Sequence, residues 1–247
     1  MTGFSGVSIV TGAVTETDSL RNTVEFILEN CNHNDLAEII IGYPERATSE
    51  CVAVIRELES MQSNVSVWSF VQKRPKLGFL TEAFDFAKGS HVITVDSDMA
   101  LDLELIPRMI ENAKKEPDTI FSASRWLGGN KFDGYNKFKM ALNFCSQKFL
   151  AVLYQSKLTD FTIPFQIIQT ELLRSINFEE TGFAIFIEMV LKPVRLGCKI
   201  KELPTDCHGR KQGKSNNSFA QLPSYLKTAL HIRFMKKDDL LKKDCQF

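Results

Sequence analysis

The sequence alternates short apolar segments with longer segments of helical pattern, and this alternation constrains the fold more than any other feature. The apolar segments are VSIVTGAV (residues 7–14), AEIIIG (37–42), VSVWSFV (65–71), HVITVD (91–96) and TIFSAS (119–124). Between them lie the segments 18–30, 47–61, 78–88 and 103–115, whose apolar residues recur with helical spacing. Strands that alternate with helices in this way form crossover units on a parallel sheet. We therefore expect an α/β, Rossmann-like fold with a mostly parallel central sheet flanked by helices.

Residues at the segment boundaries agree with this prediction. Asp18 stands at the start of the first helical segment, and Thr48 or Ser49 stands at the start of the second. Short polar side chains of this kind cap helix N-termini. Gly89 follows the third helical segment, where a helix end favours a left-handed residue. We expect the helices to begin and end near these positions.

After residue 124 the pattern changes. A glycine-rich loop, RWLGGNKFDG, leads into a long helix whose apolar residues follow the spacing of one face, which we expect to be buried against the sheet. That face comprises Phe138, Ala141, Leu142, Cys145, Phe149, Val152 and Leu153. A strand within 160–168, a helix over 183–196, the strand CKIKELP, the polar loop HGRKQGKSNNS and a helix over 221–235 complete the prediction.

The composition excludes several classes of protein. At 247 residues and 44% hydrophobic content, the chain suits a single globular domain. Its 30 Lys and Arg balance 30 Asp and Glu, so no net field gathers nucleic acid, and we expect no nucleic-acid partner. The six cysteines form no C-x-x-C pair, which favours free thiols in a reducing, cytoplasmic compartment. We interpret the neighbours Cys207 and His208 as part of a loop rather than as a zinc knuckle.

The fourth apolar segment ends in two carboxylates, in HVITVDSDM (residues 91–99). Ligands of open parallel sheets bind beyond the carboxyl ends of the strands, which is where Asp96 and Asp98 fall. In an extended chain, residues two apart point to one side, so both carboxylates can approach one ligand. Their repulsion is relieved when a divalent cation such as Mg²⁺ or Mn²⁺ binds them together with a diphosphate. The pair therefore predicts a metal–diphosphate site.

Two other interpretations of this D-x-D pair remain. Aspartates at a strand end often form a turn or a helix cap. Phosphohydrolases of the haloacid dehalogenase type also end their first strand in D-x-D, with the first aspartate as nucleophile. In those enzymes the motif lies near the N-terminus and continues with Thr or Val. Here Met99 and Ala100 follow the pair, after three other strand–helix units, which disfavours the phosphohydrolase.

The order of motifs along most of the chain resembles glycosyltransferase family 2, which has the GT-A fold. The closest resemblance is to its dolichyl-phosphate mannosyltransferase or polyprenyl-phosphate glycosyltransferase branch. The motifs that carry the resemblance are VSIVTGAVTET, RPKLGFLTEAFDFAKGSHVITVDSDM, SRW, TDFTIPFQI, FIEMVLKPVRLGCKIKELP and GRKQGKS. The resemblance implies an enzyme that moves a sugar from a nucleotide-sugar donor to an acceptor.

The resemblance also assigns roles to individual residues. It implies metal ligation by Asp96 and Asp98, with Asp98 favoured as the direct ligand and Asp96 binding either the metal or the ribose. The implied donor-binding residues are Glu16, Glu45, Asp96, Asp98, Arg210 and Lys214. The implied catalytic residues are Asp160, Arg125 and Arg210. Arg and Lys donors suit this reaction on chemical grounds too, because a diphosphate leaving group gains negative charge in the transition state.

Two carboxylates are candidates for the acceptor side. If the acceptor is a sugar hydroxyl, a carboxylate must remove its proton, and Asp160 is our first choice for this base. A lipid phosphate is already ionised and needs no base. Glu188 lies in the apolar run FAIFIEMVL, where a structural salt bridge and a functional role are equally compatible with the sequence.

The sequence departs from the family at two places. The second strand usually ends in an acidic Asp-Asp-Gly-Ser turn that holds the base and ribose, whereas here it continues as IIIGYPERATSE and retains only Glu45. The first strand lacks the usual Pro-x-Tyr-Asn before Glu16. These departures leave open the donor nucleobase and whether donor binding is changed or abolished.

The sequence therefore predicts an inverting, metal-dependent glycosyltransferase that acts on a polyprenyl phosphate or a glycan hydroxyl. The alternatives are a nucleotidyltransferase-like enzyme, which needs more glycine after the first strand, and a non-catalytic nucleotide-sugar or glycan-binding module. We expect a GT-A domain over 1–218, with a donor half (1–124) and an acceptor half (125–218), followed by an amphipathic helix and basic tail (219–247). No segment has the 18 apolar residues of a spanning helix, so we expect at most peripheral contact with a membrane. The apolar side of helix 221–235 suits either a membrane surface or packing on its own domain, and we favour packing.

Overall fold

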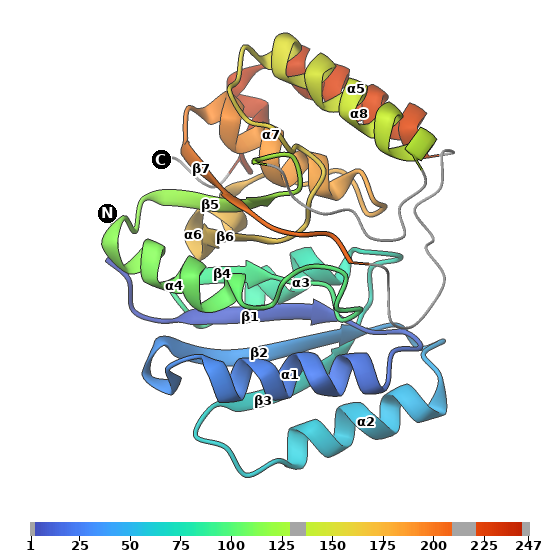
Figure 1. Ribbon diagram of the computed structural model, residues 1–247, viewed down its shortest axis with the longest axis vertical. Coiled ribbons are helices and arrows are strands. Elements are labelled where there is room, and N and C mark those ends of the chain that lie inside the picture. The colour runs from blue at the N-terminus through green and yellow to red at the C-terminus, as the bar shows by residue number, and fades with distance from the viewer. Residues whose placement is uncertain (1–2, 129–136, 209–220, 244–247) are drawn as a thin grey trace.

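A computed structural model gives the fold and describes residues 3–128, 137–208 and 221–243, apart from the side chain of Lys139. Its centre is a seven-stranded sheet in the order β3-β2-β1-β4-β6-β5-β7, with helices on both faces (Figure 1). The strands are β1 (Val7–Gly12), β2 (Leu36–Tyr43), β3 (Ser66–Val71), β4 (His91–Thr94), β5 (Thr119–Ser124), β6 (Gln166–Gln169) and β7 (Lys199–Pro204). All neighbouring strands pair in parallel except β6, which runs antiparallel to both β4 and β5. The predicted mostly parallel α/β sheet is confirmed.

The helices follow the predicted segments closely. They are α1 (Asp18–Asn30), α2 (Ser49–Ser60), α3 (Phe79–Phe86), α4 (Leu105–Lys115), α5 (Lys137–Tyr154), α6 (Thr170–Ser175), α7 (Ile185–Leu196) and α8 (Leu222–Phe234), with 3-10 turns η1 (His33–Asp35) and η3 (Lys237–Leu240). Thr48 caps α2, since its hydroxyl accepts a hydrogen bond from the backbone N–H of Cys51 at 3.3 Å. The short helix α6 was not predicted, and the expected strand over 160–168 is confined to β6.

Alternating side chains of the strands divide the core into two layers. On one face of the sheet, Ile9 and its neighbours pack against α1, α2 and α4. On the other face, Val10 and its neighbours pack against α3, α6 and α7. A third cluster lies away from the sheet, where Leu150 of α5 and Ala229 of α8 meet α7. Helices α5 and α8 therefore form an outer layer at one end of the molecule (Figure 1).

The predicted buried face of the long helix is wrong. Phe138, Phe149 and Val152 of α5 are exposed to 70%, 47% and 79%, and Ala141 and Cys145 are exposed as well. The helix instead buries the neighbouring face, which contains Gln147, Leu150 and Tyr154. Periodic spacing shows that apolar residues share a face of a helix, but it does not show which face the rest of the fold covers.

Gly89 also has a different role from the one predicted. Its φ angle is not in the left-handed region, so it is not a helix-ending residue of that type. Glycine is needed because β1 passes very close: a Cβ atom at this position would lie 2.6 Å from the backbone N of Ser8 and 2.8 Å from the carbonyl C of Val7. The backbone N–H of Gly89 also donates to the Ser8 hydroxyl at 2.9 Å.

Gly89→Ala should therefore destabilise the protein. Both close contacts are backbone atoms of a central strand, which cannot move aside easily, and overpacking of this kind costs about 1–3 kcal/mol. Chemical denaturation measures the loss. Gly3→Ala is the matched control, because a Cβ atom there meets nothing within 4 Å. A Gly89→Ala protein as stable as the control would contradict the close packing of this turn on β1.

Candidate active site at the carboxyl edge of the sheet

One edge of the sheet gathers most of the predicted site residues. Strands β1, β2, β4 and β5 point in the same direction, so their carboxyl ends share this edge. Strand β6 runs the opposite way, so the loop that precedes it, residues 159–165, reaches the same edge. The topology therefore brings the aspartate pair after β4, Arg125 after β5 and Asp160 before β6 to one side of the molecule.

The aspartate pair directly follows β4 and is fixed to its surroundings. Asp98 is buried, and its Oδ1 accepts the backbone N–H of Ala100 at 3.0 Å, whereas Asp96 is exposed. Ser97, between them, donates its hydroxyl to the carbonyl of Gly12 at the end of β1, at 2.7 Å. Met99 adopts a φ of 55°, a left-handed conformation that is costly for a non-glycine residue. The turn after β4 is thus held in one shape by contacts on both sides of the pair.

Glu16 and Glu45 lie on adjacent loops after β1 and β2. The half-buried Glu16 carboxylate accepts the backbone N–H groups of Val14 at 2.7 Å and Thr15 at 2.9 Å, so it orders its own loop. Glu45 is exposed in the turn that follows β2. A backbone hydrogen bond from Thr48 N to Val14 O, at 2.9 Å, ties the two loops together. Both glutamates therefore border the edge that carries the aspartate pair.

Arg125 and Asp160 form a buried ion pair with two parallel hydrogen bonds. Arg125 Nε donates to Asp160 Oδ2 at 2.7 Å, and Nη2 donates to Oδ1 at 2.9 Å. The Asp160 side chain is fully buried and that of Arg125 is 14% exposed. Arg125 Nη2 also donates to the Thr162 hydroxyl at 2.9 Å. Both oxygens of the Asp160 carboxylate are thus occupied by the guanidinium.

A second carboxylate, which the sequence interpretation missed, holds the loop that carries Asp160. Glu202 of β7 accepts the backbone N–H groups of Thr159 and Asp160, both at 2.8 Å. Burial raises the pKa of the Glu202 carboxyl above its ordinary value, and these backbone donors oppose the shift. The Thr159 hydroxyl lies 2.6 Å from that of Ser124, at the end of β5. The only sequence signal for Glu202 is an isolated acidic residue within a predicted strand.

The segment after β7 also runs beside the aspartate pair. His208 donates its backbone N–H to the carbonyl of Ala100 at 2.9 Å, and its Nε2 lies 2.6 Å from Asp102 Oδ1. Asp206 N donates to the other oxygen of Asp102 at 3.0 Å. The sequence interpretation treated His208 as a loop residue and gave Asp102 no role, although Asp102 follows the D-x-D closely. Arg210 and Lys214, predicted to bind the diphosphate, lie outside the described residues.

Glu188 has a structural environment. Its carboxylate lies 2.6 Å from Lys192 Nζ, one helical turn along α7, and both side chains are buried. It also accepts the backbone N–H of Glu180 at 2.8 Å. Burial raises the pKa of the Glu188 carboxyl, and Lys192 opposes the shift. The salt bridge that the sequence interpretation left open is present.

The residues at the carboxyl edge fit a divalent ion held jointly with a diphosphate. Mg²⁺ usually binds proteins through one or two carboxylates and fills its remaining positions with water and substrate phosphates. Asp96 and Asp98 supply two carboxylates. Within residues 3–128, 137–208 and 221–243, no three His, Cys, Asp or Glu side chains cluster as a metal cage. This donor set suits an ion that shares its coordination with a phosphate ligand.

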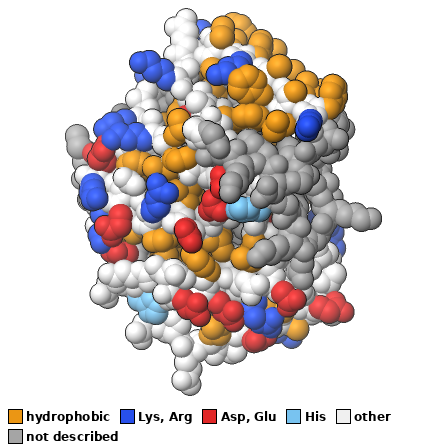
Figure 2. Space-filling view, in the orientation of Figure 1, with side chains coloured by type: hydrophobic (Ala, Val, Ile, Leu, Met, Phe, Trp, Pro, Cys, Tyr) orange, Lys and Arg blue, Asp and Glu red, His pale blue; other side chains and the backbone are white. Residues whose placement is uncertain are grey.

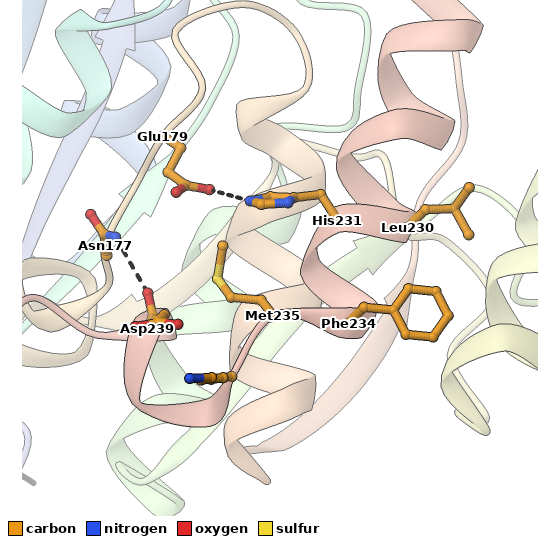
Figure 3. Close-up of a pocket in the computed structure, with 8 residues that line it drawn as sticks. Asn177, Glu179, Leu230, His231, Phe234, Met235 and Asp239 are labelled. Atoms are coloured by element: carbon orange, nitrogen blue, oxygen red, sulfur yellow. Dashed lines mark hydrogen bonds and ion pairs between the residues drawn. The ribbon is translucent and has the colours of Figure 1, made fainter.

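A pocket of about 670 Å³ lies elsewhere, between α8, η3 and the segment before α7 (Figure 3). Its lining is Asn177, Glu179, Leu230, His231, Phe234, Met235, Lys236 and Asp239. His231 Nε2 lies 3.0 Å from a Glu179 carboxylate oxygen, and Phe234 points away from this pair (Figure 3). None of the lining residues belongs to the carboxyl-edge site, and we do not place the donor here.

Known structures resemble this fold at low sequence identity. Glucosyl-3-phosphoglycerate synthase from Mycobacterium tuberculosis, in complex with Mn²⁺, uridine diphosphate and glucosyl-3-phosphoglycerate, superposes with a TM-score of 0.68. The two sequences are 17% identical, and the match covers 94% of this chain and 81% of that chain. The same synthase in complex with Mg²⁺ and uridine diphosphate also has a TM-score of 0.68. The expected GT-A fold is confirmed.

Sequence relatives agree with the structural match. Glycosyltransferase AglD of Haloferax volcanii is 23% identical over 208 residues, 81% of this chain and 32% of the relative. Undecaprenyl-phosphate mannosyltransferase of Micrococcus luteus is 25% identical over 130 residues, 51% of this chain and 53% of the relative. The chain thus spans about a third to a half of these relatives. The sequence pattern of "Glycosyl transferase family 2" matches residues 8–193. The chain therefore belongs to glycosyl transferase family 2.

Proposed function

We propose that the chain transfers a glycosyl group, with inversion at the anomeric carbon, from a nucleoside diphosphate sugar to a phosphate group carried by a polyprenyl lipid. The observation that carries the proposal is the convergence of two groups of opposite charge on one sheet edge. The Asp96–Asp98 turn supplies carboxylates for a divalent ion, and the partly buried Arg125 supplies a fixed guanidinium. An anionic donor needs the first group, and an anionic acceptor needs the second.

The reaction places definite demands on these groups. An acceptor phosphate oxygen forms a bond to the anomeric carbon while the bond from that carbon to the donor diphosphate breaks, and the nucleoside diphosphate leaves with the electron pair. A divalent ion, when bound, neutralises charge on the leaving diphosphate. Asp98 and Asp96 would hold that ion. Arg210 and Lys214 would add positive charge at the same diphosphate. Glu16 and Glu45 would border the nucleoside.

The state of Asp160 supports a phosphate acceptor over a sugar hydroxyl. A hydroxyl acceptor needs a base with an oxygen available for its proton. Both oxygens of Asp160 accept hydrogen bonds from Arg125, and the side chain is fully buried. Asp160 is therefore better suited to orienting Arg125 than to removing a proton. An ionised phosphate acceptor needs no base, and Arg125, oriented by Asp160, would place a fixed guanidinium beside its oxygens.

The relatives support this proposal as well. The Micrococcus luteus relative is named for its undecaprenyl phosphate substrate. The synthase from Mycobacterium tuberculosis binds uridine diphosphate with Mn²⁺ on the same fold. We propose accordingly that residues 1–124 hold the donor and residues 125–218 hold the acceptor. The departure at the end of β2, where Glu45 replaces the usual acidic turn, leaves the donor base to be identified by experiment.

A nucleoside diphosphate should raise the melting temperature only when a divalent ion is present. The protein is titrated with UDP, GDP, CDP and dTDP, each with Mn²⁺ and with excess EDTA. One of the four should stabilise the folded state by about 2.7 kcal/mol when it is present at a hundred times its Kd. EDTA should remove the effect, because the aspartates then repel the diphosphate.

Two results would count against the proposal. Stabilisation by a nucleotide in EDTA would exclude the shared metal–diphosphate site. No response to any of the four with Mn²⁺ would favour the non-catalytic module over the transferase. A transfer assay with polyprenyl phosphate and with a free glycan then separates the two acceptor classes.

A further inference from the structure

The outer surface of α5 is apolar although nothing in the described structure covers it. Ala141, Cys145, Phe149 and Val152 recur with helical spacing along one exposed side of the helix. Phe149 is 47% exposed and Val152 is 79% exposed. The neighbouring helix α8 adds Leu230, exposed to 42%, and Phe234, exposed to 78%. Figure 2 shows apolar side chains gathered over this end of the molecule, with basic side chains among them.

Helices α5 and α8 differ in charge from the chain as a whole. The whole sequence is balanced, with 30 basic and 30 acidic residues. Helices α5 and α8 contain no Asp or Glu, and the described Lys and Arg side chains of the two helices are Lys137, Lys148, Lys227 and Arg233. Lys148 lies beside the apolar stripe, with its Nζ 5.1 Å from the centre of the Phe144 ring. The α5 side of this surface thus combines exposed apolar side chains with positive charge, whereas Leu230 and Phe234 of α8 border the pocket that also contains Glu179 and Asp239.

The opposite side of α5 contacts the candidate active site. Asn143 Oδ1 accepts the indole N–H of Trp126 at 3.0 Å, next to Arg125. Gln147 Nε2 donates to the Thr162 hydroxyl at 2.9 Å, and that hydroxyl also binds Arg125. Helix α5 is therefore the element that separates the apolar surface from the proposed acceptor phosphate site.

We propose that the α5–α8 surface, formed by Phe149, Val152, Leu230, Phe234 and Lys148, docks on an anionic lipid bilayer. Amphipathic helices with aromatic or aliphatic residues beside Lys and Arg lie in the interfacial plane of membranes. Anionic headgroups attract the lysines, and the apolar side chains enter the boundary of the acyl chains. The biological purpose of docking rests on the proposed function, because docking through α5 would hold the Arg125 site, on the other side of this helix, close to the membrane that carries a lipid-linked phosphate.

The charges favour a bilayer over a second copy of the chain. Pairing this surface with itself would bring the described Lys and Arg side chains of one copy against those of the other, with no carboxylate in either helix. Like charges in contact oppose association. None of the described helices is long and apolar enough to cross a membrane, so binding at this surface would be peripheral.

Vesicle sedimentation tests the surface without any nucleotide or turnover. The protein is mixed with phosphatidylcholine vesicles and with vesicles that also contain phosphatidylglycerol. We expect binding to the anionic vesicles, and weaker binding as salt is raised. The double variant Phe149→Ser/Val152→Ser should bind at least about tenfold more weakly, because two apolar side chains no longer enter the bilayer. Lys148→Glu should also weaken binding, and it leaves the apolar stripe intact.

The matched control is Val71→Ser, which removes a similarly exposed apolar side chain, 43% exposed, from β3 at the far end of the molecule. It should bind vesicles like the wild type. Equal binding by the double variant and the wild type, or no binding to anionic vesicles, would overturn the proposal. Dimerisation in sedimentation velocity that the double variant abolishes would assign the surface to a second copy instead. The nucleotide-dependent thermal shift should survive in the double variant, so loss of docking and loss of donor binding are separable.

Discussion

Asp98→Asn should reduce glycosyl transfer by on the order of 10²–10³-fold and abolish the metal-dependent thermal shift. Asparagine keeps the shape of the side chain but removes the negative charge that a divalent ion requires. Charge stabilisation by a bound metal contributes several kcal/mol to the transition state, and each 1.4 kcal/mol corresponds to about tenfold in rate. Turnover with labelled donor measures the first effect, and nucleotide titration with Mn²⁺ measures the second.

The fold should survive this substitution. Asp98 Oδ1 accepts one backbone N–H, from Ala100, and an asparagine carbonyl can accept the same hydrogen bond. The control is Asp118→Asn, because Asp118 is exposed just before β5, at the opposite edge of the sheet. That variant should keep full activity and the full metal response. An Asp98→Asn protein that still responds to Mn²⁺ and nucleotide together would remove Asp98 from the metal site.

Arg125→Met should destabilise the protein by about 3 kcal/mol and abolish transfer. The substitution leaves the fully buried Asp160 carboxylate without its cation, and breaking a buried ion pair in this way costs about 3–5 kcal/mol. We expect the lower end of this energy range because the Arg125 side chain is partly exposed. For a domain of this size, a loss of 3 kcal/mol corresponds to a melting temperature roughly 6–12 °C lower. Thermal unfolding and turnover are measured on the same samples.

A second variant separates the structural role of Arg125 from its proposed role toward the acceptor. In Arg125→Met/Asp160→Asn, no charge is buried alone, so much of the lost stability should return. Transfer should still be absent, because no guanidinium contacts the acceptor phosphate. Arg125→Lys should be intermediate in stability, since lysine offers one point charge in place of a planar fork. Recovery of turnover in the double variant would show that Arg125 acts only on the fold.

The helices and strands of the first half of the molecule could be predicted because the local sequence patterns there agree with the fold. The predicted limits of α1 and β5 match the structure, since apolar periodicity, turn residues and strand length all indicate the same boundaries. The parallel sheet then places Asp96 and Asp98 at a carboxyl edge without further information. This half of the candidate site follows from the order of strands and helices alone.

The second half depends on contacts between distant segments. The sequence does not show that β6 runs antiparallel, and this reversal is what brings Asp160 to the same edge as Arg125. Glu202 can hold the loop that carries Asp160 only because β7 lies next to β5, a pairing of segments about eighty residues apart. The face of α5 was misassigned because an apolar stripe has the same spacing whether protein or a lipid surface covers it.

The central claim is that the carboxylates after β4 hold a divalent ion together with a nucleoside diphosphate. The most direct measurement is anomalous diffraction from crystals grown with Mn²⁺ and the nucleoside diphosphate that stabilises the protein. We expect one anomalous peak at a coordination distance of about 2.0–2.2 Å from an Asp98 carboxylate oxygen and from a diphosphate oxygen. A peak away from Asp96 and Asp98, or a bound nucleotide with no peak beside it, would contradict the account.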